Sequence, residues 1–175
     1  MLGKTVKLDW RIVETPAMVA LAVDRGLSNT ELQFFDSLSL AADDEKFDVV
    51  LSNGAIQYSP RPYEVLAQLA RIKADRLIIT RIPLTEAEVI LRQRSYLSTN
   101  INGSIPHDLG IRDKAIFYPV TMLDKETVVK ELKAFGTHIQ HLTDYKRAYQ
   151  TKYESYDMHG YIVQSDSSTL CLIRT

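Results

Sequence analysis

The stretch FDVVLSNGAIQYSP, residues 47–60, decides the fold class that we expect for this chain. It begins with a short apolar run at 49–51, which is followed by small polar residues at 52–54. A buried parallel strand is a continuous apolar run, and the ligands of open α/β sheets bind at the carboxyl ends of such strands. The stretch therefore predicts a strand whose polar end, residues 52–58, lines a binding site.

Short β-rich runs and helical patterns alternate around this stretch. The predicted strands are residues 10–14, 31–35, 47–52 and 76–82. Pro16 and Gly26 are typical of the start and end of a helix after the first strand, and Pro60 and Pro62 predict the start of another after the third. This alternation favours an α/β fold with a mostly parallel sheet and right-handed crossovers.

The rest of the chain is predicted to add two helices, three strands and a long loop. Thr85 and Glu88 have capping-box spacing, which predicts a helix that runs to about residue 97. The remaining predictions are a loop at 98–119, a helix at 124–135, a strand at 138–145 and an antiparallel C-terminal hairpin at 160–164 and 169–174. Residues 39–46 are predicted to form an acidic loop, and residues 146–156 have no clear pattern.

Composition limits the class of protein. A chain of 175 residues is long enough for a single domain with one core. The net charge of −1, with acids and bases interspersed, predicts no nucleic-acid partner. The one cysteine, Cys171, excludes an internal disulfide and favours a reducing, cytoplasmic location. No apolar run approaches the roughly 20 residues that span a bilayer, so we expect no membrane partner.

Four segments in a fixed order carry a resemblance to a known family. They are WRIVET at 10–15, LQFFDSL at 32–38, FDVVLSNGAIQYSPRP at 47–62 and RLIITRIPL at 76–84. In these segments the chain resembles class I S-adenosylmethionine-dependent methyltransferases, and most closely a bacterial group often associated with surface-polysaccharide gene clusters. The resemblance implies a Rossmann-like sheet, the cofactor S-adenosyl-L-methionine (SAM), and a small-molecule or carbohydrate acceptor of the methyl group.

The resemblance also implies cofactor-binding roles for residues at the strand ends. Glu14 corresponds to the acid that holds the ribose hydroxyls, since a carboxylate accepts two hydrogen bonds from a vicinal diol. Asp36 and Ser37 correspond to the adenine-binding position. The segment beside the methionine moiety is matched by Ser52, Asn53, Gly54 and Gln57. Simpler explanations also apply: Glu14 precedes a helix N-terminus, which favours an anion, Asp36 stands at a strand-to-loop junction, where acids are common, and residues 52–54 suit any turn.

Tyr58, Arg81 and His107 are the candidate catalytic residues. Methyl transfer needs an in-line approach of the acceptor, so positioning supplies much of the catalysis, and a base is needed only if the acceptor binds protonated. His107, in the predicted long loop, is the imidazole best placed for that task. Arg81 either orients an anionic acceptor or pairs with a loop acid, and Tyr58 is alternatively a packing aromatic.

No metal site is predicted from the sequence. His138, His141 and Asp144 are spaced three residues apart, and residues i and i+3 of a strand face opposite sides of the sheet. The spacing therefore disfavours a shared metal ion.

The first strand of the family, with its glycine-rich turn, has no counterpart before Trp10, where Gly3 is the one glycine. That turn needs glycines because the backbone approaches the cofactor closely. We therefore expect residues 1–175 to form a single, truncated methyltransferase-like domain that lacks the first strand. Weakened cofactor binding and homo-oligomerisation through exposed strand edges are expected consequences.

Two other functions are compatible with the sequence. One is a non-catalytic, methyltransferase-like remnant that acts as an interaction or oligomerisation module. The other is a nicotinamide-binding Rossmann enzyme, which is disfavoured because it also needs a glycine-rich turn.

Overall fold

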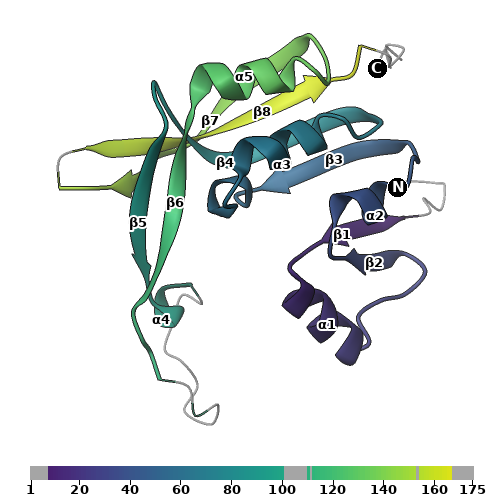
Figure 1. The fold of residues 1–175 in the computed structure, drawn as a ribbon, viewed down its shortest axis with the longest axis horizontal. Helices are drawn as coiled ribbons and strands as arrows, with labels where there is room; N and C mark the ends of the chain where they lie inside the picture. Colours follow the sequence, from purple (N-terminus) through teal and green to yellow (C-terminus); the bar gives the residue numbers. More distant parts are fainter. Residues whose placement is uncertain (1–7, 101–109, 111, 153, 167–175) are drawn as a thin grey trace, which may run out of the picture. The chain divides into compact units, whose positions relative to one another are not determined.

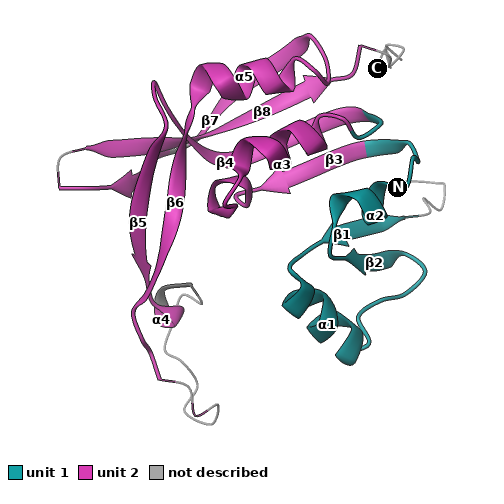
Figure 2. Cartoon of the chain, in the orientation of Figure 1, with its two compact units in different colours: residues 1–48, 72–74 teal, residues 49–71, 75–175 magenta. Residues whose placement is uncertain are grey.

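The computed structural model describes residues 8–100, 110, 112–152 and 154–166 (Figure 1). The chain divides into two compact units, which Figure 2 distinguishes by colour. Unit 1 comprises residues 1–48 and 72–74, and unit 2 comprises residues 49–71 and 75–175.

Unit 1 contains a small parallel sheet with a helix between its strands. Its elements are β1 (Trp10–Val13), α1 (Pro16–Asp24), β2 (Leu32–Phe35) and α2 (Leu38–Ala42). β1 and β2 pair in parallel, with Trp10 opposite Leu32 and Val13 opposite Phe35. The two strands and α1 confirm the prediction for this part of the chain, including Pro16 in the first turn of the helix. α2 is new, because the sequence predicts an acidic loop from residue 39.

Arg11 holds the elements of unit 1 together. Its guanidinium donates a hydrogen bond to the carbonyl oxygen of Ala41 at 2.9 Å and another to the carboxylate of Glu45. The same guanidinium carbon lies 5.3 Å from the ring centroid of Phe47. One arginine of β1 therefore fixes the position of α2 and of the segment that follows it.

Unit 2 contains most of a six-stranded mixed sheet with the strand order β5-β6-β4-β8-β7, in which β3 also pairs with β4. The strands are β3 (Phe47–Asn53), β4 (Ala74–Thr85), β5 (Val89–Ser95), β6 (Ile116–Asp124), β7 (His138–Gln150) and β8 (Ser155–Gln164). β4 pairs with β6 in parallel, whereas the pairs β4–β8, β5–β6 and β7–β8 are antiparallel. An α/β fold is confirmed, but these pairings do not confirm a mostly parallel sheet.

Two helices, α3 (Pro62–Leu69) and α5 (Lys125–Leu132), lie side by side in unit 2 (Figure 1). The shorter helices of this unit are η1 (Ile56–Tyr58) and α4 (Leu97–Asn100). The helices and the sheet bury an apolar core that includes Leu66, Leu77, Ile79, Ile82, Met122, Val128, Leu132 and Val163. Among the described helices, none has the length and apolar character needed to cross a membrane.

The helix predicted from Thr85 is wrong, because this region contains strand β5. The hydroxyl of Thr85 donates to the carbonyl oxygens of Ala87 and Leu123 and does not cap a helix. Residues 89–95 instead pair along their whole length with β6. Interstrand hydrogen bonds and cross-strand packing therefore override the local capping-box signal.

The C-terminal hairpin also differs from the prediction. Strand β8 pairs with β7 and with β4, so residues 160–164 belong to a longer strand than the sequence predicts. The expected partner at 169–174 lies outside the described residues.

Gly136, after α5, gives a test of the packing in unit 2. A Cβ atom at this position would lie 1.9 Å from the backbone carbonyl oxygen of Gln164 in β8. This overlap could be relieved only by a shift of the main chain. We expect Gly136→Ala to lower the free energy of unfolding by more than about 2 kcal/mol in urea denaturation. Lys133→Ala, at an exposed position of the same segment, is the control and should change it by less than about 0.5 kcal/mol. Equal stability of the two variants would contradict this packing.

Candidate functional site

Glu14 and Asp36 follow the ends of two neighbouring parallel strands in unit 1. The backbone N–H of Glu14 donates to the carbonyl oxygen of Phe35 at 2.9 Å, so both acids lie at the carboxyl ends of the strands, on the same side of the β1–β2 sheet. Both residues are exposed. One carboxylate oxygen of Glu14 also accepts the backbone N–H of Thr15 at 3.3 Å. The structure thus brings together two of the predicted site residues and leaves both carboxylates accessible to hydrogen-bond donors.

Ser37 lies beside Asp36, but its hydroxyl serves the fold. It accepts a hydrogen bond from the backbone N–H of Leu40 at 3.4 Å, as an N-cap of α2, and it lies 3.3 Å from the hydroxyl of Ser39. A serine immediately before the run LSLAA is the sequence signal for this cap, and sequence analysis missed it.

In unit 2, the end of β3 is held against β4 by Asn53 and Gly54. The side-chain oxygen of Asn53 accepts the hydroxyl of Thr80 at 3.0 Å, and the backbone N–H of Gly54 donates to the carbonyl oxygen of Thr80 at 2.9 Å. Gly54 has a φ of 65°, a conformation that favours glycine. The predicted segment from Ser52 is therefore a strand end followed by a bend at Gly54 and the short helix η1.

Gln57 is expected to contact the cofactor, but its side chain is only 1% exposed. Its amide nitrogen donates to the carbonyl oxygen of Arg81 at 3.1 Å and lies 3.5 Å from the hydroxyl of Tyr149. The amide oxygen of Gln57 is buried without a hydrogen-bond partner. The side chain of Gln57 is therefore not available to a ligand, and it instead fixes the backbone of Arg81.

Arg81 has the backbone conformation of a strained position. Its φ is 58°, which is uncommon for a residue with a side chain, and the β4–β8 register shifts between Ile79 and Ile82. The backbone N–H of Arg81 donates to the carboxylate of Asp144 at 2.8 Å. A Cβ atom at Gly160 would lie 3.0 Å from that same carboxylate, so the glycine makes room for it. The sequence predicts no such role for Asp144, whose spacing from His138 and His141 raised only the question of a metal site.

Tyr58 belongs to a group of tyrosines. Its hydroxyl lies 3.0 Å from the hydroxyl of Tyr149 and donates to the side chain of Gln93 at 3.4 Å. Its ring packs edge-on against Tyr118, with the centroids 5.6 Å apart. Burial, with the hydrogen bond to Tyr149, raises the pKa of Tyr58 far above its ordinary value. Tyr58 therefore keeps its proton at neutral pH and acts as a hydrogen-bonding group, not as a base.

The predicted site residues thus form two groups, one in each unit (Figure 2). Unit 1 contains Glu14, Asp36 and Ser37, and unit 2 contains the segment 52–58 with Arg81. His107 lies outside the described residues. Within the described part of the chain, no group of three or more His, Cys, Asp or Glu side chains has the arrangement of a metal site.

Comparisons with known proteins found likeness in structure. No protein-family model matches the chain, and no curated protein matches it. The N-terminal domain of EvdMO1, solved in the presence of SAH and D-fucose, is similar with a TM-score of 0.50 and 14% identity. The match covers 90% of this chain and 66% of that chain, so this chain spans slightly less than two thirds of its length.

Two further solved structures are methyltransferases. The glycopeptide N-methyltransferase MtfA has a TM-score of 0.48 and 11% identity, over 90% of this chain and 74% of that chain. An S-adenosylmethionine-dependent methyltransferase from Clostridium acetobutylicum ATCC 824 has a TM-score of 0.47 and 11% identity, over 90% and 76%. From the likeness to the EvdMO1 domain, we conclude that the chain has the fold of the class I S-adenosylmethionine-dependent methyltransferases.

Proposed function

We propose that this chain transfers a methyl group from SAM to a small-molecule or carbohydrate acceptor. The observation that carries the proposal is the pair of exposed acids, Glu14 and Asp36, at one edge of parallel strands in a methyltransferase fold. The similar EvdMO1 domain was solved in the presence of SAH and D-fucose, which supports a SAM-type cofactor and a sugar-like acceptor. A link to surface-polysaccharide synthesis stays a prediction.

The residues at the strand ends suit the parts of SAM. Glu14 would accept hydrogen bonds from the two ribose hydroxyls, and Asp36 would accept one from the adenine amino group. Ser52, Asn53 and Gly54 would lie along the methionine moiety, where a residue without a Cβ atom allows close approach. When bound, SAM supplies an electrophilic methyl group on its sulfonium sulfur. Gln57 would act through the backbone of Arg81, because its own side chain is buried.

The catalytic contribution of the site residues would come from positioning. Tyr58 retains its proton and would orient the acceptor by hydrogen bonding. Arg81 sits at the bulge of β4, where its backbone is held by Asp144, and its cation would orient an electron-rich group of the acceptor. We expect His107 to act as a base only for an acceptor that binds protonated.

We further propose that both units belong to one methyltransferase-like domain that lacks the first strand of the family. In support, β1 belongs to a two-stranded sheet with β2, whereas β3 belongs to the six-stranded sheet. Val49 and Leu51 of β3 are 45% and 53% exposed, although apolar strand residues are usually covered. Pairing of exposed strand edges between copies of the chain would give a homo-oligomer. A cytoplasmic location fits the single cysteine.

No observation on the described residues favours the non-catalytic alternative. It predicts the same fold with no gain of stability from the cofactor, so a binding measurement separates the two functions.

The first test is cofactor binding by the full chain. A ligand that binds the native state alone raises the melting temperature, so millimolar SAM or SAH should do so. Glu14→Gln removes the charge that accepts the ribose hydroxyls and should weaken SAM binding by about 10- to 100-fold in calorimetry, since a hydrogen bond to a charged group contributes about 1.5–3 kcal/mol.

Glu31→Gln is the matched control, because Glu31 is an exposed acid that directly precedes β2, at the amino end of the strand and away from Glu14. It should bind SAM as the wild type does. The proposal fails if neither SAM nor SAH changes the melting temperature, and the role of Glu14 fails if both variants bind equally.

The second test concerns the hydroxyl pair of Tyr58 and Tyr149. We expect Tyr58→Phe and Tyr149→Phe to be coupled by about 0.5–1.5 kcal/mol in a double-mutant cycle, because each removes one partner of the same hydrogen bond. Urea denaturation of the two single variants and the double variant measures this energy. Additive effects would show that the two hydroxyls do not interact.

A further inference from the structure

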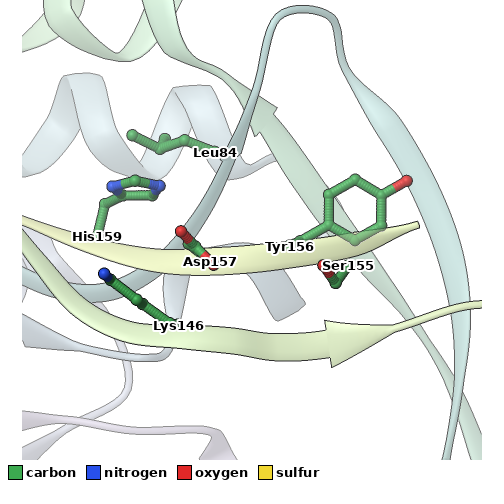
Figure 3. Close-up of a pocket in the computed structure, with 6 residues that line it drawn as sticks. All are labelled: Leu84, Lys146, Ser155, Tyr156, Asp157 and His159. Atoms are coloured by element: carbon green, nitrogen blue, oxygen red, sulfur yellow. The ribbon is translucent and has the colours of Figure 1, made fainter.

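A pocket in unit 2 lies outside the group of residues that we assign to the cofactor. It has a volume of about 480 Å³ and is lined by Leu84, Lys146, Ser155, Tyr156, Asp157 and His159 (Figure 3). This volume is within the range of small-molecule sites, about 300–1,000 Å³. Lys146 comes from β7 and Leu84 from β4, and the other four residues come from β8.

The pocket is on the strand that carries the Arg81 bulge. Leu84 follows Arg81 by three residues in β4, and His159 pairs with Ile82, next to the bulge. Tyr156 pairs with Tyr149, whose hydroxyl contacts Tyr58. The pocket is therefore built on β4, β7 and β8, the strands that also carry Arg81 and Tyr149.

The lining of the pocket suits a neutral ligand with many hydroxyls. The positive charge of Lys146 is offset by the negative charge of Asp157, so an ionic ligand of either sign meets one like charge. Ammonium, carboxylate, hydroxyl and imidazole groups together both donate to and accept from hydroxyls. Leu84 and the ring of Tyr156 add apolar surface, and the hydroxyl of Tyr156 donates to Glu154 at 2.5 Å, which orients the ring.

His159 is paired with a second imidazole. Its Nδ1 lies 3.0 Å from Nε2 of His141, and the two rings stack with centroids 5.0 Å apart. His141 in turn stacks on Tyr161, which is 2% exposed. The two histidines therefore pack against a residue of the buried core. When Nδ1 of His159 carries the proton and donates to His141, Nε2 of His159 is left with a lone pair.

We propose that this pocket binds a neutral, polyhydroxylated methyl acceptor and that His159 takes up the proton of the reacting hydroxyl at Nε2. This inference rests on the proposed function. In the transfer, the hydroxyl oxygen forms a bond to the methyl carbon, the carbon–sulfur bond breaks with its electron pair going to sulfur, and the hydroxyl proton moves to Nε2. His141 accepts the hydrogen bond from Nδ1 and stabilises the imidazolium that forms.

The charged groups around His159 are compatible with this role. Burial is the main cause that lowers the pKa of His159, and neighbouring His141 and Lys125 lower it as well. Asp157 and Asp144 act in the opposite direction. Lys146 is the cation of the pocket lining. The net effect lowers the pKa of His159, which favours the neutral imidazole that a proton acceptor requires.

The tautomer of His159 is the first test, and it needs neither cofactor nor ligand. In the full chain labelled with ¹⁵N-histidine, at a pH above the titration range of histidine, long-range ¹H–¹⁵N correlation distinguishes the two ring nitrogens. We expect His159 to carry its proton on Nδ1, with a resonance of Nε2 that moves when D-fucose is added. A proton on Nε2 would overturn the role of His159 as the base.

The second test measures binding of sugars without SAM. Saturation-transfer NMR with neutral monosaccharides, D-fucose among them, should detect binding, and D-galacturonate should bind more weakly. Asp157→Asn and His159→Gln should each weaken the binding of D-fucose by about tenfold. Circular dichroism establishes that the variants are folded.

His138→Gln is the matched control, because His138 is exposed at the start of β7 and lies 3.9 Å from Asp166, outside the pocket. It should bind D-fucose as the wild type does. No binding of any neutral monosaccharide, or equal binding by all three variants, would overturn the pocket assignment. Because SAM is absent, these results are independent of the cofactor test: sugar binding without SAM binding would refute the proposed function and keep the pocket.

Discussion

Strand β4 is the element on which the larger unit depends, because it pairs with three other strands although a strand has only two edges. With 12 residues, β4 is long enough for two strands to pair in succession along one of its edges. β3 is bonded along the first part, where Phe47 and Gly54 donate to Lys73 and Thr80, and β6 pairs with the last part at Leu84. β8 follows the other edge. Arg81 lies where the first edge changes partner, and this is where the register shifts and the backbone adopts a positive φ.

A network of side-chain hydrogen bonds maintains this change of partner. The carboxylate of Asp144 accepts the backbone N–H of Arg81, and the amide of Gln57 donates to the carbonyl oxygen of the same residue. Both backbone groups of a strained residue are thus satisfied by side chains, which compensates for the ladder bonds that a bulge loses. The expected acceptor pocket begins just beyond this point, at Leu84, and the segment from Gly54 lies just before it. The bulge therefore lies between the segment proposed to bind the cofactor and the pocket proposed to bind the acceptor.

Prediction from the sequence is most successful where local signals and tertiary structure agree. The apolar run before Ser52 forms β3, and Pro16 and Pro62 begin helices, because burial and the fixed φ of proline act within a few residues. It failed where distant residues decide the outcome. Residues 89–95 form a strand because β6 is available as a partner, and the amide of the buried Gln57 contacts Arg81 and Tyr149, which are distant in the chain. The histidine pair of His141 and His159 has no signal at all in the local sequence, since it is made by the register of β7 and β8.

The sequence by itself determined the fold class and the residues at the strand ends, because the order of apolar runs, prolines and acids is a property of the chain. It placed Glu14 and Asp36 after successive strands, and their meeting at one sheet edge then follows from parallel pairing. Only the tertiary structure decided the order of the strands, the bulge at Arg81 and the pocket beside His159. The physical reason is that interstrand register and side-chain burial are set by partners far away in the chain, where local propensity carries no information.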